Sequence, residues 1–264
     1  MFLYQPPEKE RKIKSMPGTP PNRQKEEAMR YLSKGWVPVN GILLKNIKRR
    51  IEDVSYVQER ESLISDVQSD PALFLHCCKA LRGLTGGNAL GIEPLSELRA
   101  LDSQKIKSLF NISERDICTH SLKEMDPKQA ACLQYTLLST HTTSAIAQRM
   151  HFGRDLAFSS AAMRQLGHLL MAWNYPRIYA QALALHRKNK THLDVELKKL
   201  LGFTPAEVNA KLAAEWGMHA EIRHLLPPEA AGRSTATLPF PVSYTHLRAH
   251  ETPEHLVCRL LLEK

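Results

Sequence analysis

A polar pair, Arg164-Gln165, stands in the middle of a long and otherwise apolar stretch, residues 155–173 with the sequence DLAFSSAAMRQLGHLLMAW. A helix that is apolar on every side is normally buried, so this pair is where chemistry would have to sit. Neither residue suits metal-ion chemistry. Arginine keeps its proton and cannot act as a ligand, and a neutral amide is a poor substitute for a carboxylate against a hard dication.

Two histidines accompany the pair. His168 follows Gly167 directly, and His141 lies in the helical segment before it. A metal site needs several imidazole and carboxylate ligands that converge, and one imidazole does not make one. We therefore interpret His141 as a buried or rim histidine rather than a ligand, although together with His168 it could line a residual pocket.

Motifs of other enzyme classes are missing from the sequence. It contains no Gly-rich phosphate loop and no CxxC, HExxH or GxSxG pattern. Ser139, Ser159 and Ser160 fall within helical patterns, where the strained turn of a serine nucleophile is not expected. We predict no catalytic residue, no bound metal and no cofactor.

The composition favours a helical protein of the cytosol. The chain has 264 residues, is 43% hydrophobic and only 6% aromatic, and carries a net charge of +9. Its apolar residues are mainly Leu and Ala, which favour helices over sheets. The 5 cysteines have no regular spacing, and no secretory signal precedes them, so we expect reduced thiols in the cytosol. No apolar run approaches the ~20 residues that a membrane span needs.

The last residues resemble something other than a natural protein. Residues 242–264, VSYTHLRAHETPEHLVCRLLLEK, are similar to the conceptual translation of a transposase-type sequencing adapter. We therefore exclude this segment, with its cluster of His246, His250, His255 and Cys258, from the functional argument. We expect residues 230–241 to be a linker and the natural chain to continue past Pro241.

Two basic segments could contact an anionic partner. Residues 1–25 hold five prolines and six basic residues against two acidic ones, a composition that cannot bury enough apolar area to order itself. We expect a disordered arm there. Its basic stretch Lys9–Lys14 and the basic group Lys45–Arg50 could bind nucleic acid, but no aromatic stacking residues are interleaved with them. A solvated tail and a solvated helix face are the favoured interpretations.

Helical spacing of apolar residues covers most of residues 25–229, and no strand-period pattern extends over a useful length. Asp70-Pro71 and Asp126-Pro127 each combine an N-cap residue with a first-turn proline. Thr191 is a possible N-cap, and residues 204–207 have the form of a capping box. We predict an all-α fold with helices at residues 25–35, 41–54, 57–69, 72–84, 95–110, 127–150, 155–173, 175–186, 191–201, 206–216 and 220–226.

Several short motifs occur in an order typical of one family. They are Leu63-Ile64 followed by Asp70-Pro71-Ala72-Leu73, then His141, the segment AAMRQLG at 161–167, Pro176 with Tyr179, and finally Glu196, residues 201–203, 206–208 and 213–216. In this order the chain resembles the HDOD family, a helical signalling module related to the HD phosphohydrolases, over about residues 28 to 228. The segment 161–167 falls where the family pattern reads AGLLHDxG.

The resemblance implies both a fold and a loss of catalysis. Arg164 replaces the doublet histidine and Gln165 the doublet aspartate, while His141 falls near the first ligand position. We expect a multi-helix HDOD-like bundle over residues 26–229, with an N-terminal helical lobe (26–122) and a degenerate HD-like lobe (123–229). Another part of the family pattern, which usually reads NSA, is matched only weakly, because the nearest similar segment is GGNA at residues 86–89.

Three functions remain open at this point. The first, favoured by the resemblance, is a non-catalytic bacterial regulatory domain that relays a signal through protein contacts in second-messenger or two-component systems. The second is a metal-dependent HD-type phosphohydrolase with a shifted ligand set. The third is a nucleic-acid-binding regulator that uses the basic arm. The partner and the oligomeric state do not follow from the sequence, and no contact with a membrane is expected.

Overall fold

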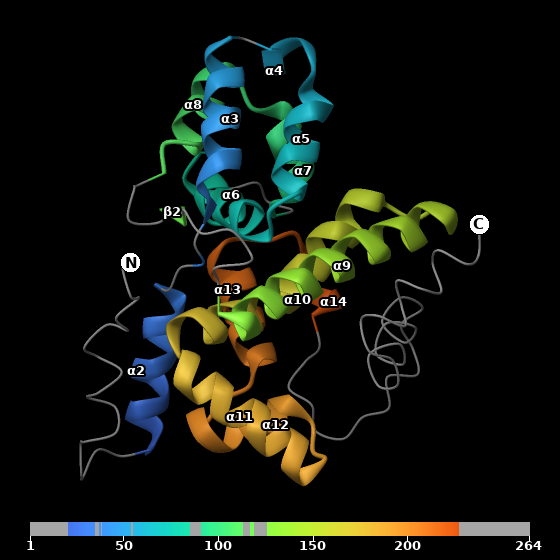
Figure 1. Cartoon of the computed structure of the whole chain (residues 1–264). Coiled ribbons are helices and arrows are strands. Elements are labelled where there is room, and N and C mark those ends of the chain that lie inside the picture. The colour runs from blue at the N-terminus through green and yellow to red at the C-terminus, as the bar shows by residue number, and fades with distance from the viewer. Residues whose placement is uncertain are drawn as a thin grey trace. The chain divides into compact units, whose positions relative to one another are not determined.

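The computed structural model describes residues 21–34, 37, 39–53, 55–84, 91–112, 117–118 and 126–226. These residues are almost all helical (Figure 1), so the predicted all-α fold is confirmed. Residues 1–20 of the basic arm, the linker at 230–241 and the adapter-like segment lie outside the described residues. The helices are α2 (Pro21–Ser33), α3 (Gly41–Glu52), α4 (Ser55–Gln58), α5 (Arg60–Gln68), α6 (Pro71–Leu84), α7 (Pro94–Ala100), α8 (Ser103–Leu109), α9 (Pro127–Arg149), α10 (Arg154–Asn174), α11 (Pro176–Asn189), α12 (Leu193–Leu201), α13 (Pro205–Glu215) and α14 (Ala220–Leu225).

Helix α10 is the central element of the fold. It contacts α2, α6, α7, α9, α11, α13 and α14. Every residue from Ala157 to Asn174 is buried except Arg164. A helix that is apolar on all sides must be covered by neighbours on all sides. The predicted burial of the stretch 155–173 is therefore confirmed.

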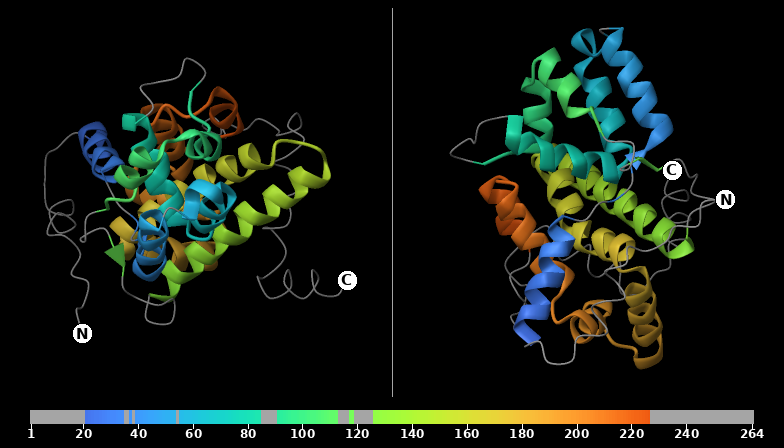
Figure 2. Two further views of the ribbon diagram at one scale, coloured as in Figure 1. Left: turned by 90° about the horizontal axis from the view of Figure 1, so that it is seen from above. Right: turned by 90° about the vertical axis from the view of Figure 1, so that its left-hand side faces the viewer.

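Helices α9 and α10 form a helical hairpin. They are 23 and 21 residues long, and they run side by side in Figure 1 and in the right-hand view of Figure 2. Their turn is fixed by a left-handed backbone at His151, with φ 58°, and by the Phe152 N–H, which donates to the Ala147 carbonyl at 2.9 Å. The hairpin places the segments that carry His141 and Arg164-Gln165 against each other.

Helices α3 to α8 form the N-terminal lobe, and α6 and α7 of this lobe contact α10. Helix α2, which we expected to belong to this lobe, packs instead against α10 and α13, where Lys25 Nζ lies 3.3 Å from Glu207 Oε1. It also begins at Pro21, inside the segment 1–25 that we expected to be disordered. The fixed φ of proline suits a first helical turn, which explains the earlier start.

The predicted N-terminal caps at Asp70, Asp126 and Thr204 are confirmed. The Asp70 carboxylate accepts the Ala72 N–H at 2.9 Å, and the Asp126 carboxylate accepts the Lys128 N–H at 2.8 Å. Both bonds of the capping box between Thr204 and Glu207 are present.

Three local predictions were wrong. Thr191 does not cap α12; His192 does, and the Thr191 hydroxyl donates to Glu196 at 2.6 Å instead. The helix expected at 95–110 divides into α7 and α8, because Asp102 caps a new helix through the Lys105 N–H. The helix expected at 57–69 is α4 and α5, separated at Glu59. In the first turn of α3, Ile42 is 75% exposed, whereas Leu44 and Ile47 of the same helix are buried.

Two short backbone pairings were not predicted. Strand β1 (Val39–Asn40) pairs in parallel with β2 (Ile117–Cys118), and Ile92 bridges to Met218. Elements of one or two residues show no alternation in a sequence, so the pattern could not reveal them. The Ile92 bridge ties the start of α7 to the turn between α13 and α14, with the His219 N–H donating to the Ile92 carbonyl at 2.9 Å.

Candidate functional site

The doublet positions lie halfway along α10, and Gln165 faces α9. Its side chain is 5% exposed, and its Nε2 donates to the Ser139 hydroxyl at 3.5 Å. The α9–α10 hairpin brings these residues together, because Ser139 lies on the side of α9 that packs on α10. A neutral amide and a hydroxyl therefore occupy the space between the helices where the family pattern has a carboxylate.

Arg164 is half-buried, and its backbone is held by α13. Asn209 Nδ2 donates to the Arg164 carbonyl at 2.8 Å, while Asn209 Oδ1 accepts the Gly167 N–H at 2.6 Å. Asn209 is 3% exposed, so these two bonds are shielded from water. The residue at 167 must be small, because a Cβ there would lie 2.4 Å from the Pro205 carbonyl oxygen. This close crossing of α10 and α13 explains the glycine after the doublet.

His141 is an exposed residue of α9. Its Nε2 lies 3.3 Å from the Gln68 carbonyl oxygen, and its ring meets that of Phe158 edge to face with 5.5 Å between centroids. The structure thus places His141 at the rim of the domain, between the end of α5 and the start of α10.

His168 is buried and faces the opposite end of the lobe. Its Nε2 lies 3.1 Å from Asp194 Oδ1 at the start of α12, and its ring packs edge to face on Tyr179 of α11. His141 and His168 therefore contact different elements, and the structure does not bring them together in a residual pocket. Among the residues that the structure describes, no group of three His, Cys, Asp or Glu side chains could hold a metal ion.

Cys77, Cys78 and Cys132, whose side chains the structure describes, are buried free thiols. Burial raises the pKa of the Cys77 and Cys78 thiols well above their ordinary value, because the interior disfavours the thiolate. Both residues are buried in α6 and belong to its core face.

The basic group on α3 is partly engaged within the chain. Arg50 donates to Asp66 at 2.8 Å and to Ser62 at 2.7 Å, and its guanidinium lies 4.4 Å from the centre of the Tyr56 ring. A guanidinium held in this way contributes little to a phosphate-binding face. Of the basic residues in the arm, only Arg23 and Lys25 fall within the described residues, and Lys25 is paired with Glu207.

Sequence reasoning did not reveal the bonds made by Glu196 of α12 and Arg99 of α7. Glu196 is 1% exposed and accepts hydrogen bonds from the Thr191 hydroxyl at 2.6 Å and from Lys199 at 2.9 Å. These bonds lower the pKa of Glu196, with the Thr191 hydroxyl the largest cause. Arg99 of α7 bonds to Glu61 of α5 and to Asp155 of α10, each at 2.5 Å. The sequence around a charged residue such as Arg99 contains no pattern that reveals its partners on other helices.

Comparison with known proteins identifies the lobe. Residues 108–227 match the model of the HDOD domain. Neither the curated proteins nor the solved structures contain a match to the chain. In the described part of the chain, none of the helices combines the length and the apolarity that a membrane crossing requires. The expectation that the HDOD-like region begins as early as residue 26 stays a prediction, but residues 108–227 of this chain belong to the HDOD domain family.

Proposed function

We propose that this HDOD protein is a non-catalytic regulatory module of bacterial signal transduction that acts through contacts with other proteins. The observation that carries the proposal is the chemistry of Arg164 and Gln165 at the doublet positions. A guanidinium cannot release its proton to bind a metal, and an amide gives a hard dication a weaker ligand than a carboxylate does. The Gln165 side chain is moreover buried against Ser139 of α9.

The α9–α10 turn supports a role in protein contacts. Met150 and Phe152 in this turn are 49% and 50% exposed, although both are large and apolar. Methionine and phenylalanine are enriched at the centres of protein interfaces. The left-handed backbone at His151 holds the turn in one shape, so the two side chains are presented with little entropy to lose on binding.

Hydrolysis of a generic phosphoester tests the absence of catalysis. The full chain is incubated with bis-para-nitrophenyl phosphate and with Mn²⁺, Fe²⁺ or Mg²⁺, beside the double variant Arg164→His with Gln165→Asp. We expect both proteins to stay at the background rate, because restoring the doublet does not supply the other ligands. Metal-dependent turnover by the wild-type chain would refute the proposal, and turnover by the double variant would show that the remaining ligands are present.

Site-specific photo-crosslinking tests the protein contact. A photoreactive phenylalanine analogue at position 152 is compared with the same analogue at Lys107, an exposed position on α8. We expect a discrete protein adduct from position 152 that weakens when Met150 is replaced by serine. Equal, diffuse crosslinking from both positions would argue against this turn as the contact.

A further inference from the structure

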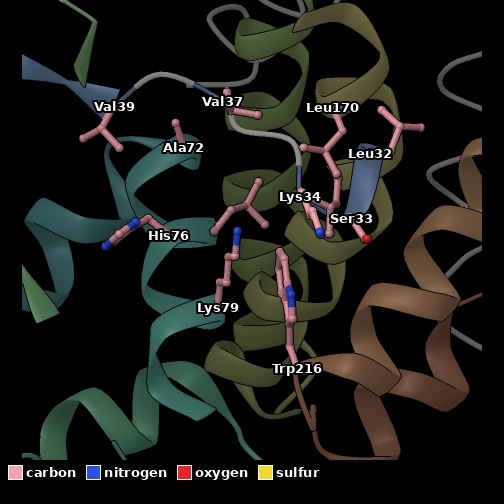
Figure 3. Close-up of a pocket in the computed structure, with 12 residues that line it drawn as sticks. Leu32, Ser33, Lys34, Val37, Val39, Ala72, His76, Lys79, Leu170 and Trp216 are labelled. Atoms are coloured by element: carbon pink, nitrogen blue, oxygen red, sulfur yellow. The ribbon is translucent and has the colours of Figure 1, made fainter. Parts of the chain in front are cut away.

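A small pocket opens beside α10, next to Leu166 and Leu170. It has a volume of about 190 Å³ and lies where α2, α6, α10 and the end of α13 meet (Figure 3). Its lining residues come from these four elements, from the segment between α2 and β1, and from β1 itself: Leu32, Ser33, Lys34, Val37, Val39, Ala72, Leu75, His76, Lys79, Leu166, Leu170 and Trp216.

The inner walls of the pocket are apolar. Leu166 and Leu170 of α10, which are 1% and 4% exposed, form one wall. The indole of Trp216, at 8% exposure, adds a flat aromatic surface next to them. Apolar walls with a few polar groups are the usual composition of a small-molecule site.

The mouth of the pocket is positively charged. Lys34 at the end of α2 and Lys79 of α6 are both exposed, and Figure 3 shows their amino groups reaching toward the same space. The side chain of His76 also lines the pocket, but its Nε2 lies 3.2 Å from the Leu109 carbonyl oxygen, so it is held within the chain. The lining contains no Asp or Glu. Within the ranges that the structure describes, neither lysine forms an ion pair with a carboxylate of the chain.

We propose that this pocket binds a small aromatic phosphate monoester. The ring packs against Trp216 and the leucines of α10, and the phosphate lies between Lys34 and Lys79. A phosphate monoester carries about −1.5 to −2 charges at neutral pH. Its charge therefore balances two ammonium groups more closely than the single negative charge of a carboxylate would. The size also fits one ring, since a cavity of about 150 Å³ accepts benzene.

The proposal goes beyond the proposed signalling role and does not depend on it. The ligand would contact α6 of the N-terminal lobe and α10 and α13 of the HDOD lobe in one pocket. A molecule that binds only the folded arrangement raises the free energy of unfolding, and this gain grows with the logarithm of the ligand concentration above Kd. The same ligand would therefore strengthen the contact between these helices.

Calorimetric titration of the full chain with phenyl phosphate tests the site. We expect one binding event with a Kd on the order of 1 mM or tighter, the range open to a ligand of this size. Inorganic phosphate, which lacks the ring, and benzyl alcohol, which lacks the charge, should each bind at least tenfold more weakly. Benzoate should bind more weakly than phenyl phosphate, and equal affinity for the two would overturn the assignment to phosphate.

Variants separate this pocket from binding elsewhere on the basic surface. Lys34→Met and Lys79→Met each remove the charge but keep an unbranched apolar side chain that is only one atom shorter, and each should weaken phenyl phosphate binding about tenfold. Lys45→Met removes an exposed lysine of α3 and should leave the affinity unchanged. All three positions are exposed, so the variants should fold, and circular dichroism verifies it. Unchanged affinity in the Lys34→Met, Lys79→Met double variant would refute the proposal.

Discussion

Replacing Gly167 with alanine tests the contact that organises the doublet region. A Cβ at this position would lie 2.4 Å from the Pro205 carbonyl oxygen, 2.8 Å from Pro205 Cα and 2.9 Å from Asn209 Oδ1. Favourable non-bonded contacts begin at about 3.5 Å, so α10 and α13 would have to separate by about 1 Å. Two of the three clashing atoms belong to the backbone and cannot rotate away.

The energetic balance favours destabilisation. Alanine gains about 1 kcal/mol over glycine from helix propensity. Against this gain, forcing a methyl group into a close-packed interface costs about 1–3 kcal/mol and sometimes more, and it also strains the two bonds made by Asn209. We expect a net loss of about 1–2 kcal/mol, which corresponds to a fall in Tm of roughly 2–8 °C for a domain of this size.

Gly83 provides a matched control. It is also a helical glycine, near the end of α6, but a Cβ there would meet nothing within 4 Å. Gly83→Ala should therefore raise the free energy of unfolding by up to about 1 kcal/mol. Both variants are measured by urea denaturation followed by circular dichroism. If Gly167→Ala is as stable as Gly83→Ala, the close crossing of α10 and α13 is incorrect.

Two further predictions concern buried carboxylates. Asp70→Ala should destabilise the protein by about 1–3 kcal/mol in urea denaturation, because it removes the N-cap of α6 and leaves the buried Ala72 N–H without its acceptor; a loss below about 0.5 kcal/mol would contradict this role. The folded-state pKa of Glu196 is lowered by the Thr191 hydroxyl and by Lys199, so its ionised form stabilises the fold above the unfolded pKa of about 4.3, and that stability is lost as the pH falls through the folded pKa. Glu196→Gln should flatten the dependence of the unfolding free energy on pH in this acidic range, and an unchanged profile would show that Glu196 makes no linked contribution.

The local features of the fold could be predicted from the sequence. The burial of α10 follows from its lack of charge, and the caps at Asp70, Asp126 and Thr204 follow from residue types and spacing within four positions. The misassigned cap at Thr191 shows the limit of such rules. Its hydroxyl had a stronger acceptor in the buried carboxylate of Glu196, and His192 took its place.

The long-range features of the site could not be predicted. The Asn209 side chain bonds to backbone groups more than forty positions earlier in the chain. Asp194 of α12 contacts His168 of α10, although the whole of α11 lies between them in the sequence. The pocket beside Trp216 combines residues of α2, α6 and α10, which only the packing of those helices brings together. Sequence spacing carries no information about such contacts, whereas the substitutions at Arg164 and Gln165 are visible in the sequence itself.

Metal stoichiometry tests the central claim most directly. The full chain is dialysed to equilibrium against Mn²⁺, Fe²⁺ or Zn²⁺, and bound metal is measured by mass spectrometry in the wild type and in the His141→Ala and Gln165→Ala variants. Because the doublet positions lack metal ligands, we expect the same number of bound metal ions per chain in all three proteins. One or two ions per chain that are lost on replacing His141 or Gln165 would contradict it.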